Sequence, residues 1–558
     1  MDMLKRKIAP WLIIGVALGA GCSDEPNPIE DDTPDPPGNV TVTATSAVTA
    51  QISFTPVSGA TGHILERAEG ASGTFAQIAT PTTSPYDDTG LTPLATYRYR
   101  LKTISGSKQS DYSSVASVTL PDRALQVVTA DISANTTWTN ANRYRLQGFI
   151  HVANGATLTI EKGTTIEGDF ATVGSSLFVL RGAKIDAQGT ADEPIVFTSS
   201  QPVGSRQAGD WGGLIIIGNG IVNRSPPVIL EGSGTGANNP ALDYAGGTDN
   251  TDNSGILKYV RIEFAGFATA PDAELNTLTL AAVGSGTQID FVQSLNGLDD
   301  SFEFFGGAVD AKHLVSYNSG DDHFDISEGY VGRLQHLIAY QNVQVVPRPQ
   351  AGNISSDPQG IENDGCAGSN CTNGQASQPF NVPVVANFTL VGPPASVTSS
   401  SGGIGMMLRR GTGGFYVNGV VARWSRAAIS LRDQETLNRN AGGLLELKNL
   451  LLGENAVTFQ PQTGTTVQGT VDLAANSIQE GAAAAAAIFS ALPASPADAN
   501  TLDWTPASGS EAATGGLATF TGELATRAGT VVTGTAYRGA ADPSGAKWWA
   551  GWTRYAEN

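Results

Sequence analysis

Short segments in which apolar and polar residues alternate run along the chain from about residue 40. Within the first 120 residues they are separated by Gly, Pro, Ser and Thr, and no helical period interrupts them. Alternation with period two predicts strands that bury one face, and several such strands close together predict an antiparallel β-sandwich. The clearest of these segments are residues 40–44, 51–54, 63–67 and 91–100.

A second series of short apolar segments begins near residue 127 and continues for more than 300 residues. Gly and Asn lie between the segments, and no convincing helical period intervenes. Short strands at a steady spacing predict an all-β sandwich, a propeller or a solenoid. Seven segments illustrate the series: residues 144–152, 156–160, 177–180, 194–197, 214–217, 257–264 and 288–292.

Internal repeats distinguish among these three architectures. Residues 296–304 (NGLDDSFEF) match residues 318–326 (NSGDDHFDI) 22 positions later, and residues 313–317 (HLVSY) match 336–340 (HLIAY) 23 positions later. A propeller blade needs about 40 residues, and the Leu-rich signature of leucine-rich repeats is absent. The period therefore predicts an all-β chain whose main body is a right-handed parallel β-helix, with one repeat in each coil.

One helix is predicted late in the chain. Ser477 and Glu480 form a Ser-x-x-Glu capping box in front of a run of Ala, which is the best helix former. We therefore expect a short helix over about residues 478–491 that covers or flanks the end of the solenoid. Its apolar side chains would dock it: Ile488, Phe489 and Leu492.

Composition sharpens this picture. The chain has 66 Gly among 558 residues, and tight corners between short strands explain the excess because they need positive φ. With 40% hydrophobic residues the chain is not disordered in bulk. A net charge of −20 argues against nucleic acid as a partner, since polyanions repel. Three Cys are too few for a disulfide scaffold.

The N-terminus has the features of an export signal. Lys5, Arg6 and Lys7 precede an apolar run over residues 8–20, which is shorter than the about 20 residues that span a bilayer. The sequence LGAGC that ends this region resembles the bacterial lipobox, in which cleavage precedes a lipid-bearing Cys. The resemblance implies a signal peptide over residues 1–21 and lipidation at Cys22. A secretory peptide with an incidental Cys is the alternative.

Residues 22–38 are rich in Pro and acidic residues and predict a solvated tether. Ser23 follows the lipobox Cys, and by resemblance to enterobacterial sorting rules it favours the outer membrane, with the protein facing the periplasm or the cell surface. Cys366 and Cys371 are then expected to form a local disulfide. Zinc would need two more ligands nearby, and no His lies in that segment.

The first module resembles a fibronectin type III domain. Residues 91–100 (LTPLATYRYR) are similar to the stretch of that family in which a Tyr forms the tyrosine corner, and Tyr97 occupies its position. Phe54 stands where these domains often have Trp, which is a mild departure. The resemblance implies a fibronectin type III domain over residues 39–121, used as a spacer.

The main body resembles the pectin-lyase-like superfamily of β-helices. It is most similar to secreted or lipid-anchored β-helix proteins found especially in Bacteroidota, which bring no established activity. The resemblance covers roughly residues 127–555 and implies a β-helix domain with a C-terminal extension over residues 122–558. It rests on residues 155–168, 209–218 and 252–260, on the Asp-Asp repeats and on the tail 548–553, whose Trp cluster is expected to anchor the tail on its own domain.

The Asp-Asp repeats provide the candidate site. If Phe302 and Phe324 point into the solenoid, residues of opposite parity point outward, so that Ser301 stacks on His323. The next coil then adds a carboxylate after an insertion. The outer wall would carry a column of Glu303, Asp325 and Glu362 and a neighbouring pair of Asp299 and Asp321.

Three interpretations of this wall stay open. The Asp residues cap turns and hydrogen-bond the backbone of neighbouring coils. Alternatively, the five carboxylates bind Ca²⁺, which takes six to eight oxygen ligands. In the third interpretation the wall is a catalytic cleft, because glycoside hydrolases on this fold use Asp pairs. The catalytic candidates would be Asp321, Asp322, Asp325 and His323. Other sequence elements of polygalacturonases, Asn-Thr-Asp, Gly-His-Gly and Arg-Ile-Lys, are missing, which argues against direct transfer of that activity.

A basic cluster follows the acidic repeats. Polysaccharide lyases on this fold combine Ca²⁺ with a basic side chain that removes a proton beside a uronate. Counted at 22–23 residues per coil, the cluster lies more than three coils, roughly 15 Å, from the acidic wall. We therefore expect it to pair with other acidic residues. It comprises Arg409, Arg410, Arg423, Arg426 and Arg432.

Two functions follow from the sequence. The first is an extracytoplasmic lipoprotein anchored in the outer membrane, which has a non-catalytic binding or structural role towards a polysaccharide or a surface protein, with Ca²⁺ as a stabilising ion. The alternative is a Ca²⁺-assisted polysaccharide lyase or glycoside hydrolase that acts on acidic glycans.

Overall fold

The computed structural model describes residues 33–153, 155–271, 273–355, 358–366, 368–394, 403–481, 484–493 and 501–555. The chain divides into two compact units, Met1–Pro121 and Asp122–Asn558. Within the described residues no helix is long and apolar enough to cross a membrane. The predicted signal peptide and Cys22 lie outside the described residues.

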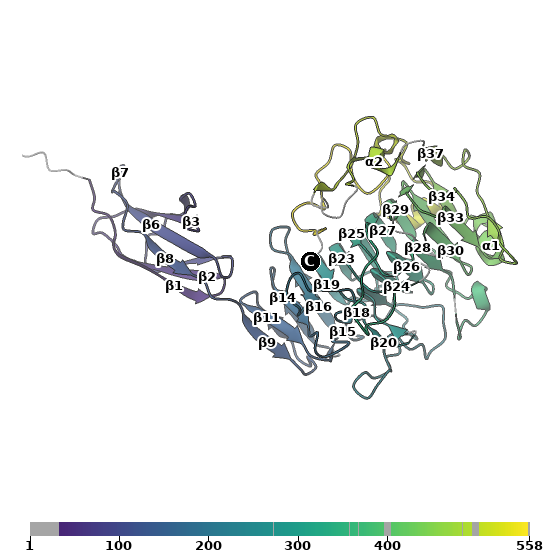
Figure 1. Cartoon of the computed structure of the whole chain (residues 1–558), viewed down its shortest axis with the longest axis horizontal. Coiled ribbons are helices and arrows are strands. Elements are labelled where there is room, and N and C mark those ends of the chain that lie inside the picture. The colour runs from purple at the N-terminus through teal and green to yellow at the C-terminus, as the bar shows by residue number, and fades with distance from the viewer. Residues whose placement is uncertain are drawn as a thin grey trace, which may run out of the picture. The chain divides into compact units, whose positions relative to one another are not determined.

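The first unit is built from two antiparallel sheets (Figure 1, purple). One contains β1 (Gly38–Ser46), β2 (Thr49–Thr55) and β5 (Tyr86–Thr89). The other contains β3 (Gly62–Glu69), β4 (Ala76–Ala79), β6 (Thr96–Ser105), β7 (Lys108–Gln109) and β8 (Ala116–Thr119).

Alternation along β6 creates the core of this unit. Tyr97, Tyr99 and Leu101 are buried, whereas the residues between them are half-buried. The backbone N–H of Thr92 donates a hydrogen bond to the Tyr97 hydroxyl at 3.0 Å, which is the tyrosine corner expected of a fibronectin type III fold. Phe54 is also buried and packs edge-on against His63.

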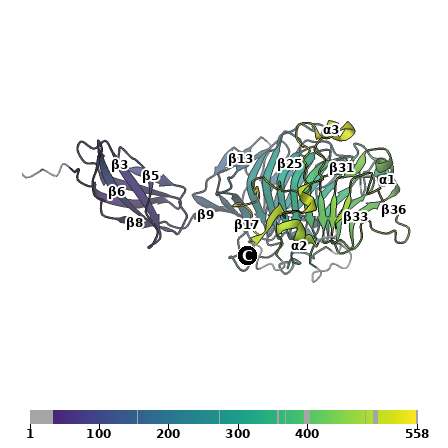
Figure 2. The same ribbon diagram turned by 90° about the horizontal axis from the view of Figure 1, so that it is seen from above.

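The second unit is a parallel β-helix with two main sheets (Figures 1 and 2). The first sheet, which carries the candidate site, is parallel except at its last pair. It consists of β12 (Phe149–Val152), β15 (Ser176–Val179), β18 (Gly213–Ile217), β22 (Leu278–Ala281), β24 (Phe302–Phe305), β26 (Phe324–Ser327), β28 (Gln359–Asp364), β30 (Ile404–Arg409), β33 (Ala427–Arg432) and β36 (Gln468–Gly469).

The second main sheet bends around the rest of each coil. Its early strands are β9 (Ala124–Val128), β10 (Thr136–Trp138), β11 (Asn142–Leu146), β13 (Thr157–Ile160), β14 (Thr165–Gly168), β16 (Lys184–Gln188) and β17 (Ile195–Ser199). Its later strands are β19 (Gly255–Glu263), β23 (Gln288–Leu295), β25 (Asp310–Tyr317), β27 (Arg333–Tyr340), β29 (Val384–Val391), β31 (Gly414–Val417), β32 (Val420–Ala422), β34 (Leu445–Lys448), β35 (Leu451–Gly453) and β37 (Gln479–Gly481).

Each long strand of the second sheet contains a bend in left-handed backbone conformation. β16 pairs with the first half of β19 and β17 with the second half, so that the single long strand β19 takes the place of two short strands in its coil. The residue at the bend has φ between 50° and 64°: Tyr259, Phe291, His313, His336 and Asn387, followed in later coils by Asn418 and Asn449 at 57° and 54°. Each coil therefore has three strand segments.

The core lies inside the coils, where matching side chains stack. Phe302 and Phe324, partners in the register of β24 and β26, lie with parallel rings 5.3 Å apart. Both rings are fully buried in a single cluster that runs through the solenoid. The predicted fold class is confirmed, and the 22-residue repeat corresponds to one coil.

The predicted helix over residues 478–491 is wrong in extent. Among the described residues of this range only α2 (Ala485–Ile488) is helical, and it is followed by β38 (Phe489–Ala491), which pairs with β39 (Asp503–Pro506). The docking residues Ile488, Phe489 and Leu492 are buried as predicted. Pairing with β39 and burial of these side chains outweigh the helical preference of the Ala run.

Several other elements are local. They are α1 (Gln434–Ala441), which the sequence pattern missed, α3 (Gly522–Ala528), two turns of 3-10 helix (Gly374–Ala376 and Glu511–Ala513), and a hairpin of β20 (Ala268–Ala270) and β21 (Ala273–Glu274).

The last part of the chain, residues 535–555, runs back over the bends of the second sheet, and we call it the C-terminal strap. Its far end lies beside β23 (Figure 1). There the carbonyl of Arg554 accepts a hydrogen bond from the side-chain amide of Gln293 at 2.6 Å. Trp549 and Trp552 are buried and Trp548 is half-buried. The Trp cluster therefore anchors the tail on its own domain.

Candidate acidic site

The outer face of the first sheet carries the predicted column of carboxylates. The register pairs Glu303 with Asp325 across β24 and β26, and Asp325 with Glu362 across β26 and β28. The alignment across the insertion is thus confirmed. Asn276 donates a hydrogen bond from its side-chain amide to Glu303, which orients the first carboxylate of the column.

Loops beside this column form a cavity of about 370 Å³. Residues 353–355 provide one wall, and the backbone N–H of Ser355 donates to the carbonyl of Gly320 at 3.1 Å. Gly320 has no room for a side chain, because a Cβ there would lie 1.8 Å from the carbonyl oxygen of Leu298. The acidic residues that line the cavity are Glu231, Glu274, Asp299, Asp300, Glu303, Asp321 and Asp325.

Two members of the Asp-Asp repeats do structural work. The backbone N–H of Asp322 donates to Asp300 Oδ1 at 2.8 Å, and the backbone N–H of Gln359 donates to Asp322. These carboxylates link successive coils as a ladder, which is the first of the three interpretations. For Asp300 and Asp322 the turn-capping role is therefore real, and one oxygen of each is engaged in it.

Three overlapping sets of carboxylate oxygens lie close enough to share a cation. Within each set the oxygens lie within 4.8 Å of one another, and Asp300 and Asp325 each belong to two sets. Asp325 Oδ1 is buried and has no hydrogen-bond partner. The sets are Asp299, Asp300 and Asp321; Asp300, Glu303 and Asp325; and Asp322, Asp325 and Glu362.

Burial and mutual repulsion raise the pKa values of these carboxyl groups. The pKa of Asp325 lies well above its usual range because of burial, and then because of the charges of Glu362 and Asp364. Glu303 and Asp300 shift in the same direction, again chiefly through burial. The pKa of Glu362 rises to about 8. Charged carboxylates at this density require protons or cations to compensate them.

The distance predicted between the basic cluster and the acidic wall is wrong. Arg409 lies in the coil directly after Glu362, because the register pairs Asp364 with Arg409. Arg409 donates from Nε to Asp364 at 2.8 Å and also contacts Glu362. Arg410 pairs with Asp364 as well. Loops lengthen the coils here, so that Ile361 pairs with Met406, and counting residues overestimated the number of coils.

The rest of the basic cluster lies apart from the cavity. Arg423 donates to the carbonyl of Gly392, and Arg432 donates to Ser430 and Gln460. Pairing of Arg409 and Arg410 with acidic residues agrees with the sequence prediction, although their acidic partners are those of the column itself.

His323 is not on the outer wall. Its side chain is 2% exposed, its Nδ1 lies 2.5 Å from the Ser316 hydroxyl, and its ring meets Trp424 edge-on. It lines a separate cavity of about 50 Å³, and burial lowers its pKa to about 3. The turn before β26 interrupts the alternation of inward and outward side chains, so the sequence pattern predicted the wrong face for His323. A neutral, enclosed imidazole does not act as an acid or base in the acidic cavity.

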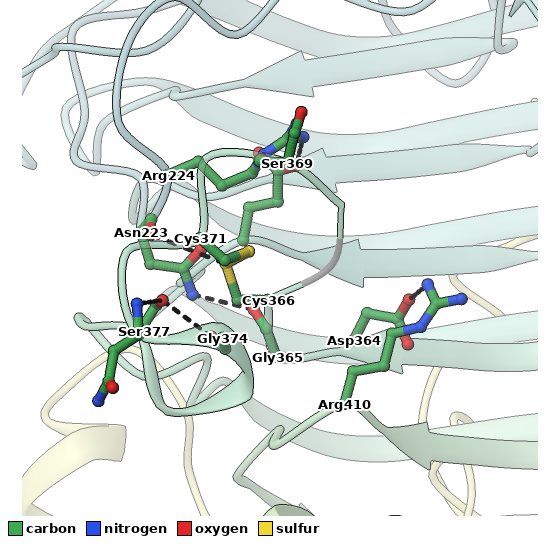
Figure 3. Close-up of a disulfide and its surroundings, with 12 residues drawn as sticks. Asn223, Arg224, Asp364, Gly365, Cys366, Ser369, Cys371, Gly374, Ser377 and Arg410 are labelled. Carbon is green, nitrogen blue, oxygen red and sulfur yellow. Dashed lines mark hydrogen bonds and ion pairs between the residues drawn. A yellow bond between two sulfur atoms is a disulfide. The ribbon is translucent and has the colours of Figure 1, made fainter.

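Cys366 and Cys371 form a disulfide that closes a short loop beside this wall (Figure 3). Asn223 donates from its side-chain amide to the carbonyl of Gly365 at 2.9 Å, and Arg224 donates to the carbonyl of Ser369 at 3.1 Å. The disulfide loop thereby holds the segment that leads to Glu231.

Sequence reasoning identified most of the cavity but not all of it. The sequence pattern predicted Asp299, Asp321 and the three residues of the column. All of these line the cavity except Glu362, which belongs to the set that it forms with Asp322 and Asp325. Sequence reasoning omitted Asp300 as a ligand, although the Asp-Asp repeat shows it. Glu231 comes from a loop and Glu274 from strand β21 of the hairpin, and no repeat or motif marks them.

The comparison with protein families matches residues 130–505 to the pectate-lyase like beta helix domain. The chain belongs to the pectate-lyase-like β-helix family. The matched residues include the whole acidic column of this family member and most of its coils. No curated protein matches the chain.

Solved structures to which this chain is similar include fibronectin type III-like domains. A Fn3-like protein from Clostridium thermocellum is 25% identical, with 16% of this chain and 97% of that chain covered and a TM-score of 0.15. The FN5 domain of Drosophila Lar is 21% identical over 16% of this chain and 98% of that one, with a TM-score of 0.15. For a set of titin domains the identity is 20%, the coverage 16% and 33%, and the TM-score 0.16.

Proposed function

We propose that this protein is a non-catalytic, extracytoplasmic binding protein whose acidic cavity holds Ca²⁺ and, through it, an acidic polysaccharide or surface partner. One observation carries the proposal: Asp300 and Asp325 link three overlapping sets of carboxylates, and both residues line one cavity. Ca²⁺ takes six to eight oxygen ligands in flexible geometry, and carboxylates supplied by strands and loops suit it better than the strict octahedron of Mg²⁺.

Calorimetric titration of the chelator-treated mature protein with Ca²⁺ tests this proposal. We expect saturable binding that is weakened at least tenfold in Asp325→Asn and unchanged in Asp111→Asn. Asp111 is exposed in the first unit and serves as the matched control. Absence of Ca²⁺ binding by a folded wild-type protein would overturn the cation site, and equal binding by the two variants would place the site elsewhere.

The proposal includes anchoring of the chain through lipid on Cys22 to the outer membrane. Support comes from the lipobox-like sequence and from the acidic, Pro-rich residues that follow it. Cys22→Ser should abolish incorporation of labelled fatty acid and release the protein from the membrane fraction. Membrane association that persists in Cys22→Ser would contradict a lipid anchor.

A Ca²⁺-assisted lyase or hydrolase for acidic glycans is the second candidate, and contact of Arg409 with Glu362 favours it. The argument against it is also electrostatic. Two carboxylates raise the pKa of Arg409 and so disfavour the neutral form that a base requires. A panel of uronate polysaccharides with Ca²⁺, monitored for unsaturated and reducing products, separates the candidates. Turnover lost in both Arg409→Lys and Asp325→Asn would establish the enzyme.

A further inference from the structure

The bends of the second sheet form a ladder of stacked rings beneath the C-terminal strap. Tyr259 and Phe291 stack with centroids 4.3 Å apart, Phe291 and His313 at 4.3 Å, and His313 and His336 at 5.0 Å. The planes of each pair are within 9° of parallel. Along the solenoid the ladder passes from the rings of Tyr259 and Phe291 to two imidazoles, so that its His end can take up protons.

The strap is fixed to this ladder at successive points. Trp548 lies 4.9 Å from the ring of His313, and Trp552 meets Tyr259 edge-on at 5.8 Å. The carbonyl of Ala540 accepts a hydrogen bond from Nδ1 of His336 at 3.1 Å. A carbonyl only accepts, so Nδ1 of His336 carries the proton and the neutral ring is complete with Nε2 unprotonated.

The surroundings of His336 disfavour the addition of a second proton to its ring. The like-charged neighbours are His313, whose ring faces it, and Lys312, both on β25. Asp542 on the strap opposes them. Asp290 on β23 is hydrogen-bonded to His313 at 2.7 Å and is therefore engaged with the other imidazole. Burial is the largest influence, and together these groups lower the pKa of His336 to about 4.

We propose that the strap is an acid-sensitive clasp: protonation of His336 releases residues 540–555 from the stacked rings. The chain adopts the closed state while His336 is neutral and the ring column is covered. When the strap opens, the imidazole regains water and its ordinary affinity for protons, so acid shifts the population toward the open state. Opening would expose Tyr259 and Phe291 to solvent.

The sign and size of the effect follow from linkage. Because the pKa of His336 is lower in the closed state than its ordinary 6.5, closure is fully favoured above pH 6.5 and loses stability as the pH falls toward 4. The difference between 6.5 and about 4 corresponds to roughly a 300-fold change in the closing equilibrium.

Hydrogen exchange of the full mature chain, followed by mass spectrometry at pH 7, 5.5 and 4, tests the proposal. At pH 4 His336 is only half protonated in the closed state, so the limiting change is not complete there. After correction for the intrinsic rate, we expect protection of residues 540–555 to fall about 100-fold from pH 7 to pH 4. Strands β25 and β27 should keep their protection. Constant protection of the strap, or equal loss in the strap and these strands, would overturn the proposal.

Two variants locate the effect. His336→Phe places in the ladder the ring that Phe291 already contributes, so it should fold, keep the strap closed at pH 7 and show no acid release. His313→Phe removes the neighbouring charge and should raise the pKa of His336 in the closed state, which makes the change between pH 7 and pH 4 smaller than in the wild type without abolishing it. Acid release that persists unchanged in His336→Phe would assign the switch to another group and refute the clasp.

Discussion

At the residue scale, the Asp side chains of the acidic wall have two different roles. Asp300 and Asp322 each use an oxygen to accept a backbone N–H from the next coil, whereas Asp325 Oδ1 is buried without a partner. The repeated Asp-Asp pattern predicted the position of these residues but not this division. Which oxygen meets a backbone N–H depends on the turn before each strand, where the simple alternation ends.

Removal of one charge from the wall should stabilise the cation-free protein. In chelator at pH 8, Asp325→Asn should raise the free energy of unfolding of the second unit by about 1–2 kcal/mol, because repulsion with Glu362 and Asp364 is relieved. Urea denaturation measures the change. In Ca²⁺ the order should reverse, with the variant less stable than the wild type. A variant that is destabilised under both conditions would contradict the electrostatic argument.

The wall also predicts the pH dependence of the cation-free protein. Its carboxyl groups have raised pKa values in the folded state, so the stability they contribute is present below their ordinary pKa and is lost as the pH rises. For Glu362 that window runs from 4.5 to about 8. In chelator we expect a higher melting temperature at pH 5.5 than at pH 8.5, and Ca²⁺ should remove the difference. Calorimetry at the two pH values decides the matter.

At the scale of elements, repeats proved to be the most informative signal. Residues 296–304 and 318–326 look alike because they occupy one position in adjacent coils, where Phe302 and Phe324 must stack. The loops between coils carry no such constraint. Coil counting therefore misplaced Arg409, and helix propensity misjudged residues 478–491, where burial and pairing with β39 decide the structure.

The fibronectin type III unit offers a test of a single element contact. Tyr97→Phe keeps the buried ring but removes the hydroxyl that accepts the N–H of Thr92. The free energy of unfolding of the first unit should fall by about 1 kcal/mol, since the hydrogen bond between Tyr97 and the backbone of the exposed Thr92 is lost. Calorimetry of the full chain should show a shift of the transition of this unit alone. Tyr112→Phe, which alters an exposed Tyr of the same unit, is the comparison.

At the scale of the whole chain, the site combines segments that no local pattern connects. Glu231 and Glu274 approach Asp299 through loops and a hairpin, and the disulfide loop braces the segment before Glu231. The charge of −20 is therefore partly concentrated at one wall. Sequence periodicity can predict the column because strand spacing repeats, but it cannot predict which long loop folds over the column.

The strap should contribute much of the stability of the second unit. Trp552 is fully buried against Tyr259 and Phe291, and its main-chain carbonyl accepts a hydrogen bond from Arg261 at 3.0 Å. Trp552→Ala should lower the free energy of unfolding by about 3–5 kcal/mol and expose the tail to proteases at pH 7. Calorimetry and limited proteolysis measure both effects. The control is Leu94→Ala, an exposed position at 65% where little should change.

The long loops after β27 and β28 have a consequence for how this wall can vary. Large insertions leave the register of Phe324, Ile361 and Met406 unbroken. The spacing of the stacked strands is thus independent of the number of residues in the loops that connect them. Duplication of residues 302–323 would add one strand spacing of about 4.8 Å to the stack and, through the second copy of Glu303, one more carboxylate to the column. The reach of the wall along a polymeric ligand is therefore a quantity that can be lengthened one coil at a time.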